Sequence, residues 1–188
     1  MKLEHYEIGD FYFAGESSDS PLLPIILEHS TTYYLSSSFW ATQATLTAIN
    51  SYAKNNTLGN CLDIGQGDGC LSILAKKLGA KNVYGFDILP EAKTCMLQNA
   101  KANDVEINYL DDHVLPDGIT IDSVFVNINL GMHKLALPFK KHFTKDTVIF
   151  YGGIYKTKVE PDSEIEETYN IIEKYNVKEW LCYILKIK

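Results

Sequence analysis

The sequence predicts an α/β fold, in which a doubly wound and mostly parallel sheet carries helices on both faces. From residue 60 onward, short apolar segments typical of strands alternate with segments whose apolar residues recur at helical spacing. The strand segments are continuously apolar, which indicates that they are buried on both faces. A glycine cluster follows the first of these strands, at the edge where such sheets bind ligands.

The chain divides near residue 58 into an irregular front and this regular α/β body. In the front we expect a small hairpin over residues 6–13, which turns at Gly9-Asp10, and a helix over residues 43–54. In the body we expect strands at 61–64, 82–86, 105–109, 123–128, 146–151 and 179–187. We expect helices at 70–78, 90–102 and 131–142, and a further one that starts at the capping box 163–166 and carries Tyr169 and Ile172 on one face. Because residues 175–179 are too few for the usual penultimate strand and turn, we expect a shortened last hairpin.

Length and composition indicate one globular domain. The chain has 188 residues, of which 46% are hydrophobic and 22% are charged. We therefore expect a single domain over residues 1–188, with residues 1–37 as an irregular amino-terminal extension that covers the ligand site. No apolar run approaches the roughly 20 residues of a membrane helix, and no secretory h-region is visible. These features predict a cytoplasmic protein without a membrane partner.

Charge and cysteine usage exclude further classes. The formal net charge of −7 is poorly suited to duplex nucleic acid, because non-specific binding depends on lysine and arginine neutralising phosphates. The four cysteines show neither the short spacing of a metal site nor a disulfide-type cluster. We expect buried, reduced thiols and no metal.

The segment Asp63-Ile64-Gly65-Gln66-Gly67-Asp68-Gly69 carries most of the functional signal. Glycines at this position let a ligand approach the bare backbone. The spacing G-x-G-x-G departs from the dinucleotide fingerprint G-x-G-x-x-G, which disfavours a nicotinamide-dependent oxidoreductase. Asp87 ends the next strand, where a carboxylate can accept two hydrogen bonds from a ribose diol. A tight turn alone would explain the glycines, but it would not explain why they occur together with Asp63 and Asp87.

Residues 61–105 resemble the cofactor-binding half of class I S-adenosylmethionine-dependent methyltransferases. Within that class, the chain is most similar to the bacterial ribosomal-protein lysine methyltransferase family (PrmA), over roughly residues 38–188. The shared features are K-L-G-A at residues 77–80, the acid Asp87, D-x-x-P-x-A at 87–92, a partial D-x-x-x-x-N-I-L at 122–130, and an echo of S-G-I at 152–154.

The resemblance implies S-adenosylmethionine as cofactor and assigns roles to individual residues. Gly65 and Gly67 would lie against the cofactor, Asp87 would hold its ribose, and Ile88 would cover one face of the adenine. Asp111 or, in our assignment, Asp112 would contact the adenine edge. Asn127 would lie beside the reactive methyl group and act in catalysis. The expected cofactor-binding set is Thr45, Asp63, Gly65, Gln66, Gly67, Asp87, Ile88, Asp112 and Asn127.

The sequence departs from the family in the segment before the first body strand. The family's F-G-T-G-T-H-P-T-T appears here as Ser-Phe-Trp-Ala-Thr-Gln-Ala-Thr over residues 38–45. One threonine of the family segment is kept: it corresponds to Thr45, or to Thr42 if the alignment gap is placed differently. Trp40 either caps the cofactor pocket or packs in the core. The family's amino-terminal recognition domain has no counterpart among the residues before position 38.

These observations predict a methyltransferase that acts on a nitrogen of a protein, a peptide or a small amine. The Asn127 side-chain oxygen would accept hydrogen bonds from the acceptor amine and direct its lone pair toward the methyl group. Asn129 is the second candidate at this position, with helix capping as its alternative role. His113 is a candidate base, although a surface or structural role is favoured for it. The alternatives for the whole chain are a catalytically silent methyltransferase-like binding module and a small-molecule O-methyltransferase.

Overall fold

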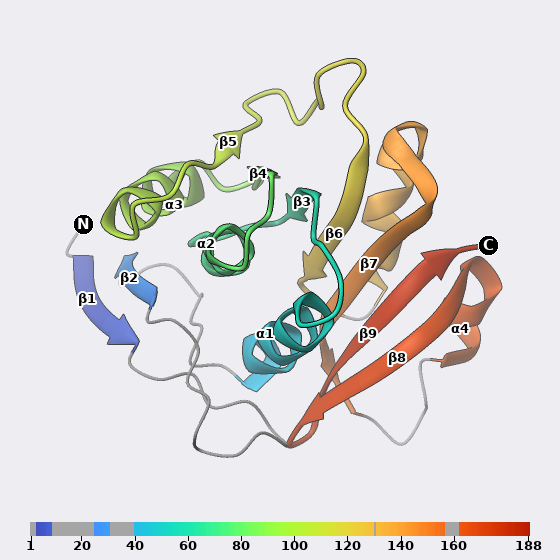
Figure 1. Cartoon of the computed structure of the whole chain (residues 1–188). Coiled ribbons are helices and arrows are strands. Elements are labelled where there is room, and N and C mark those ends of the chain that lie inside the picture. Colours follow the sequence, from blue (N-terminus) through green and yellow to red (C-terminus); the bar gives the residue numbers. More distant parts are fainter. Residues whose placement is uncertain (1–2, 9–24, 31–39, 130, 157–161) are drawn as a thin grey trace.

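The computed structural model of the chain describes residues 3–8, 25–30, 40–129, 131–156 and 162–188. Figure 1 shows its elements in chain order. They are β1 (Leu3–Ile8), β2 (Ile25–Ser30), α1 (Trp40–Ala53), β3 (Asn60–Ile64), α2 (Cys70–Lys77), β4 (Asn82–Phe86), α3 (Pro90–Ala102), β5 (Asn108–Tyr109), β6 (Ile121–Asn127), the 3₁₀ helix η1 (Met132–His142), β7 (Phe143–Tyr155), α4 (Asp162–Thr168), β8 (Tyr169–Val177) and β9 (Trp180–Ile187).

The described strands form a seven-stranded sheet in the order β5-β4-β3-β6-β7-β9-β8. The pairs from β5 to β7 are parallel, whereas β9 is antiparallel to both of its neighbours. The chain order reverses between β3 and β6, so the carboxyl ends of these two neighbouring strands form the crevice where doubly wound sheets bind ligands. The predicted mostly parallel, doubly wound sheet is confirmed.

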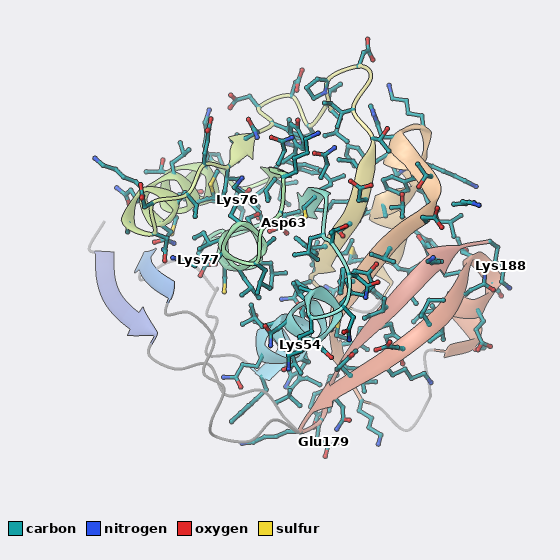
Figure 2. All side chains as sticks on the ribbon, in the orientation of Figure 1. Lys54, Asp63, Lys76, Lys77, Glu179 and Lys188 are labelled. Atoms are coloured by element: carbon teal, nitrogen blue, oxygen red, sulfur yellow. The ribbon has the colours of Figure 1, made fainter. Side chains whose placement is uncertain are left out.

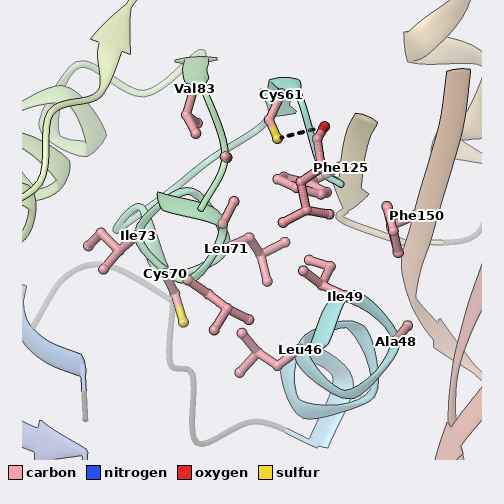
Figure 3. Close-up of a cluster of buried hydrophobic side chains, with 14 of the residues drawn as sticks. Leu46, Ala48, Ile49, Cys61, Cys70, Leu71, Ile73, Val83, Phe125 and Phe150 are labelled. Carbon is pink, nitrogen blue, oxygen red and sulfur yellow. Dashed lines mark hydrogen bonds between the residues drawn. The ribbon is translucent and has the colours of Figure 1, made fainter. Parts of the chain in front are cut away.

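Apolar side chains cover both faces of the sheet. On β6, Phe125 belongs to a cluster with residues of α1, α2 and α3, whereas its neighbours Val124 and Val126 belong to a second cluster with residues of η1 and α4. Successive side chains of a strand point to opposite faces, which is why a continuously apolar strand serves two cores. Figure 3 shows the first cluster, in which Ile49 of α1 points toward Phe125 of the sheet and Leu46 points toward α2.

The amino-terminal hairpin differs from the prediction. β1 pairs antiparallel with β2, and Ile8 lies opposite Ile25. The predicted hairpin over residues 6–13 is therefore wrong in its partner strand. Residues 9–13 themselves lie outside the described residues, as does most of the predicted extension over residues 1–37.

The last hairpin also differs, because β8 is a full strand of nine residues rather than a truncated one. The helix that starts at Asp162 ends at Thr168, so Tyr169 and the expected helical position Ile172 belong to the strand. A turn of two residues suffices between the strands, since Val177 pairs with Trp180 and Lys178 adopts a positive φ of 52°. The prediction of a shortened last hairpin is wrong for this reason.

Several smaller predictions can be checked against the described residues. Residues 132–142 are helical as expected, but the helix is of the 3₁₀ type and contains Pro138, which cannot donate a backbone hydrogen bond. All four cysteines are buried free thiols, as predicted. Among the described helices, none has the length and apolar character to cross a membrane.

Candidate active site

Backbone hydrogen bonds hold the glycine loop, which follows β3, to the end of β4. The N–H groups of Gly65 and Gln66 both donate to the carbonyl oxygen of Phe86, at 3.0 and 3.1 Å. Gly65 and Gly67 adopt φ values of 70° and 57°, in the left-handed region that favours glycine. The loop that follows β3 is thus held in shape by hydrogen bonds to the last residue of β4, and the sequence predicted these two strands to carry the site.

Asp87 ties this loop to the start of α3. Its Oδ2 atom accepts a hydrogen bond from the Gly67 N–H at 3.0 Å, and its Oδ1 atom accepts one from the Leu89 N–H at 2.9 Å. A carboxylate offers about four acceptor positions, so each oxygen keeps one for a ligand. These bonds fix the carboxylate in one orientation at the rim of the pocket described next.

A pocket of about 870 Å³ opens at the carboxyl ends of β3, β4 and β6. Its polar lining side chains are Asp87, His113 and Asn127. The remaining lining residues are apolar or glycine, namely Ile64, Gly65, Phe86, Ile88, Leu89, Ile128, Met132, Leu135, Pro138 and Phe139. A large, mostly apolar pocket with a few convergent polar groups is typical of a small-molecule site.

One end of this pocket is aromatic. The His113 ring stacks on the Phe86 ring with 4.6 Å between centroids and 22° between planes, and Phe139 lies 5.6 Å from Phe86. The backbone of His113 adopts a positive φ of 57°. Met132, Leu135 and Phe139 of η1 also line the pocket, and their helical spacing in the sequence is a signal by which this wall could have been found.

The other end of the pocket is marked by Asn127, the last residue of β6. Thr45 of α1 donates its hydroxyl hydrogen bond to Asn127 Oδ1 at 2.8 Å. Asn127 Nδ2 in turn donates to Thr42 Oγ1 at 3.2 Å. The two threonines, between which the sequence left a choice, therefore both hold the amide. Thr45 is fully buried and is not among the residues that line the pocket.

Two buried carboxyl groups lie beneath the glycine loop. Asp63 accepts a hydrogen bond from Ser72 Oγ at 2.7 Å, and Figure 2 shows Asp63 beside α2. Asp68 accepts one from the Cys70 backbone N–H at 3.0 Å. Burial is the largest cause that raises the pKa of Asp63 to about 7, and it raises the pKa of Asp68 to about 7 as well. Neither residue lines the pocket, which indicates that they support the loop from below.

Other predicted cofactor residues lie outside the pocket or at its edge. Ile88 lines the pocket but is 82% exposed, as an open face toward a ligand would be. Gln66 is buried beside Gly85, and neither atom of its amide group has a hydrogen-bond partner within the described structure. Asp112 is exposed, and its Oδ1 atom accepts a hydrogen bond from the Val114 N–H at 3.1 Å.

Asp111 and Trp40 also face partners other than the pocket. Asp111 forms an ion pair with Lys93, so at this loop His113 rather than either aspartate lines the pocket. Trp40 packs under the Lys178 ammonium group, which lies 3.4 Å from the ring centroid. The ring is 41% exposed, and Trp40 is not among the pocket-lining residues, so neither expected role describes it. Within the described residues, no group of three or more metal-ligating side chains comes together.

Comparison with known proteins identifies the family. The family model described as "Ribosomal protein L11 methyltransferase (PrmA)" matches residues 38–188, which is most of the chain. The chain belongs to the ribosomal protein L11 methyltransferase family. The resemblance drawn from the sequence motifs is thereby confirmed, over the same residues that the motifs indicated.

Relatives named ribosomal protein L11 methyltransferase include one from Thermosipho africanus, which is 37% identical over 67% of this chain and 48% of its own length. Another from Clostridium perfringens is 31% identical over 78% of this chain and 48% of its own length. The chain thus spans about half the length of the curated relatives it matches. The crystal structure of ribosomal protein L11 methylase from Lactobacillus delbrueckii subsp. bulgaricus has a TM-score of 0.67, 28% identity, and coverage of 79% of this chain and 78% of that one.

A more distant structure extends the match in fold. The 16S rRNA N2 G1207 methyltransferase RsmC of T. thermophilus, in complex with AdoMet and guanosine, has a TM-score of 0.74 at 14% identity. The match covers 99% of this chain and 51% of that one. At this identity the likeness concerns the fold alone.

Proposed function

We propose that this chain binds S-adenosylmethionine in the pocket beside the glycine loop and transfers its methyl group to a nitrogen of a protein. The observation that carries the proposal is the fixed carboxylate of Asp87 at the pocket rim, next to the loop that begins at Gly65. Family membership supports the reaction class, and it disfavours the nicotinamide-dependent alternative. The relatives' name supports ribosomal protein L11 as the acceptor to test first.

The pocket fits the chemistry of this cofactor at both ends. The carboxylate of Asp87 keeps acceptor positions for the two hydroxyls of a ribose. Ile88, Phe86 and His113 offer an apolar and aromatic surface on which an adenine can stack. Gly65 also lines the pocket, and a Cβ atom there would lie 2.8 Å from the Ile128 side chain, so only glycine keeps the present packing beside the loop. S-adenosylmethionine supplies a methyl group that its positively charged sulfur already activates for displacement.

The chain's own contribution is chiefly to orient the acceptor. Thr45 donates to Asn127 Oδ1 and Asn127 Nδ2 donates to Thr42, so both ends of the Asn127 amide are held in place. Asn127 Oδ1 has a second lone pair, which can accept a hydrogen bond from a neutral acceptor amine. That bond would aim the nitrogen lone pair along the line of displacement, and alignment of this kind can contribute about 7–11 kcal/mol in favourable cases.

The cofactor assignment is tested by Asp87→Ala in isothermal titration with S-adenosylmethionine. Loss of charged hydrogen bonds to the ribose is expected to weaken binding by about 1.5–3 kcal/mol. Asp117→Ala is the comparison variant, and because this exposed aspartate of the loop after β5 does not line the pocket we expect an almost unchanged dissociation constant. Equal affinity of Asp87→Ala and the parent protein would contradict the ribose assignment, and tighter binding of NADH than of S-adenosylmethionine would contradict the class.

The catalytic assignment is tested by Asn127→Ala with purified L11 of Thermosipho africanus as acceptor. At saturating cofactor, methyl transfer is expected to fall by about 10–1000-fold, as when one oriented polar group is lost. Asn129→Ala serves as the matched control, because that residue is exposed and its backbone carbonyl, rather than its side chain, accepts the Tyr151 hydroxyl. A larger loss in Asn129→Ala than in Asn127→Ala would refute the assignment. Binding of the cofactor without turnover on L11, peptides or amines would instead support a silent binding module.

A further inference from the structure

Gly152 of β7 lies directly against the hydrogen bond that orients Asn127. In the parallel pairing of β6 and β7, Asn127 is opposite Gly152. A Cβ atom at position 152 would lie 1.8 Å from Thr45 Oγ1, 3.1 Å from Thr45 Cβ and 2.7 Å from Asn127 Oδ1. Atoms cannot approach so closely, so the contact between Thr45 and Asn127 occupies the volume that any other residue at 152 would fill.

The requirement for glycine at 152 concerns space rather than backbone conformation. The adjacent Gly153 has a positive φ of 76°, which favours glycine by itself, whereas Gly152 does not have a φ in that region. The two glycines fall where the pairing of β7 with β9 shifts register, between Tyr151 and Ile154. Such irregularities are frequent next to active sites, where they redirect side chains or backbone.

The neighbours of Gly152 have little freedom to move aside. Thr45 is fully buried on α1, a helix that packs on β7 and β9. Its Cβ atom would also lie too near an added methyl group, so rotation of the hydroxyl alone does not restore ordinary contact distances. A side chain at 152 must therefore separate Thr45 from Asn127.

We propose that Gly152 is a positioning residue that seats the Thr45–Asn127 pair, and thereby sets the orientation of the Asn127 amide toward the acceptor. The proposal rests on the proposed function, since it takes Asn127 as the residue that orients the acceptor nitrogen. It assigns to β7 a role in catalysis although Gly152 itself is not among the residues that line the pocket.

The kinetic test is Gly152→Ala, with L11 of Thermosipho africanus and S-adenosylmethionine as substrates. We expect kcat to fall by about 100-fold, because a displacement of about 1 Å in a positioned group has effects of this size. The dissociation constant for S-adenosylmethionine and the KM for L11 are expected to change by less than about threefold, as when an interaction of the transition state alone is lost. Gly118→Ala is the matched control. An alanine at 118 is strained because the backbone there has a φ of 78°, but nothing lies within 4 Å of its added methyl group. It should lower thermal stability and leave kcat unchanged.

A spectroscopic readout separates orientation from general loss of stability. The side-chain amide resonances of Asn127 can be identified by their loss in Asn127→Ala. We expect them to shift in Gly152→Ala and to stay in place in Gly118→Ala. Parent-like kcat together with unmoved Asn127 resonances in Gly152→Ala would overturn the proposal.

A double-mutant cycle tests the contact itself, whatever the acceptor proves to be. Gly152→Ala should lower the melting temperature much less in a Thr45→Ala background, which removes the nearest atom, than in the parent protein. Additive losses would overturn the proposal. If Gly152→Ala alone does not fold, recovery of folding by Thr45→Ala or Asn127→Ala supports it, and recovery by neither overturns it. If Asn127→Ala retains full activity, the proposed function fails at Asn127, while the cycle still decides whether Gly152 seats the pair.

Discussion

Asp68→Asn is expected to change how the stability of the protein depends on pH. Asp68 is 3% exposed, and burial raises its pKa from 3.8 to about 7. Between these two values the unfolded chain releases the proton while the folded chain retains it. The free energy of unfolding therefore falls as pH rises from about 4 to about 7, and this contribution stays constant at higher pH. Asparagine removes the titration but keeps an oxygen to accept the Cys70 N–H.

The size of the effect follows from the two pKa values. At 1.36 kcal/mol per pKa unit, the difference corresponds to about 4 kcal/mol for an isolated group, and relaxation around the charge reduces it, so we expect about 2–4 kcal/mol. The nearby charge of Asp63 contributes to the raised pKa of Asp68.

Urea unfolding at several pH values between 4.5 and 8 measures this dependence. The free energy of unfolding of Asp68→Asn, minus that of the parent protein, should increase as pH rises, whatever its value at the lowest pH. Asp117→Asn, at an exposed aspartate in the loop after β5, should keep a constant difference from the parent. The reasoning is refuted if the difference for Asp68→Asn is also constant over this range.

Two further substitutions test buried polar groups outside the reacting centre. Gln66→Met replaces an amide whose buried atoms have no hydrogen-bond partner within the described structure, so the variant should be at least as stable as the parent, by up to about 1–3 kcal/mol in urea unfolding. A loss of stability would show that the amide has a partner. Tyr169→Phe removes a buried hydroxyl that donates to the His133 carbonyl at 2.9 Å, and should cost about 1–2 kcal/mol by the same measurement. An unchanged midpoint would contradict that bond as a stabilising contact.

The sequence predicted the central α/β body well, because local signals and the global fold agree there. The helix α3 begins at Pro90 and ends before Asn103, as its proline and asparagine indicated. The strand β4 matches its predicted bounds of 82–86. In these segments apolar spacing, capping residues and turn residues all favour the same element. The tertiary contacts therefore agree with the local preferences of the sequence.

The last third of the chain was harder, because its local signals conflict with the final pairing. The capping box and the apolar residues Ile165, Tyr169 and Ile172 favour one long helix. The structure instead uses Tyr169 to start β8, where it pairs with Ile187 of the last strand. Tyr169 and Ile187 are 18 positions apart, and a helical pattern within one segment cannot reveal such a contact.

The site shows the same division between what is local and what is not. Asp87 and the glycine loop could be located from the sequence, because each follows directly from the end of a strand in a parallel sheet. The orientation of Asn127 could not, since it depends on Thr45 and Thr42, more than 80 residues earlier, and on a missing side chain at Gly152. A motif marks where a polar group lies, but its direction is set by the packing around it. In the proposed reaction, which depends on alignment, the buried contacts behind Asn127 would therefore be as much a part of the site as the residues that line the pocket.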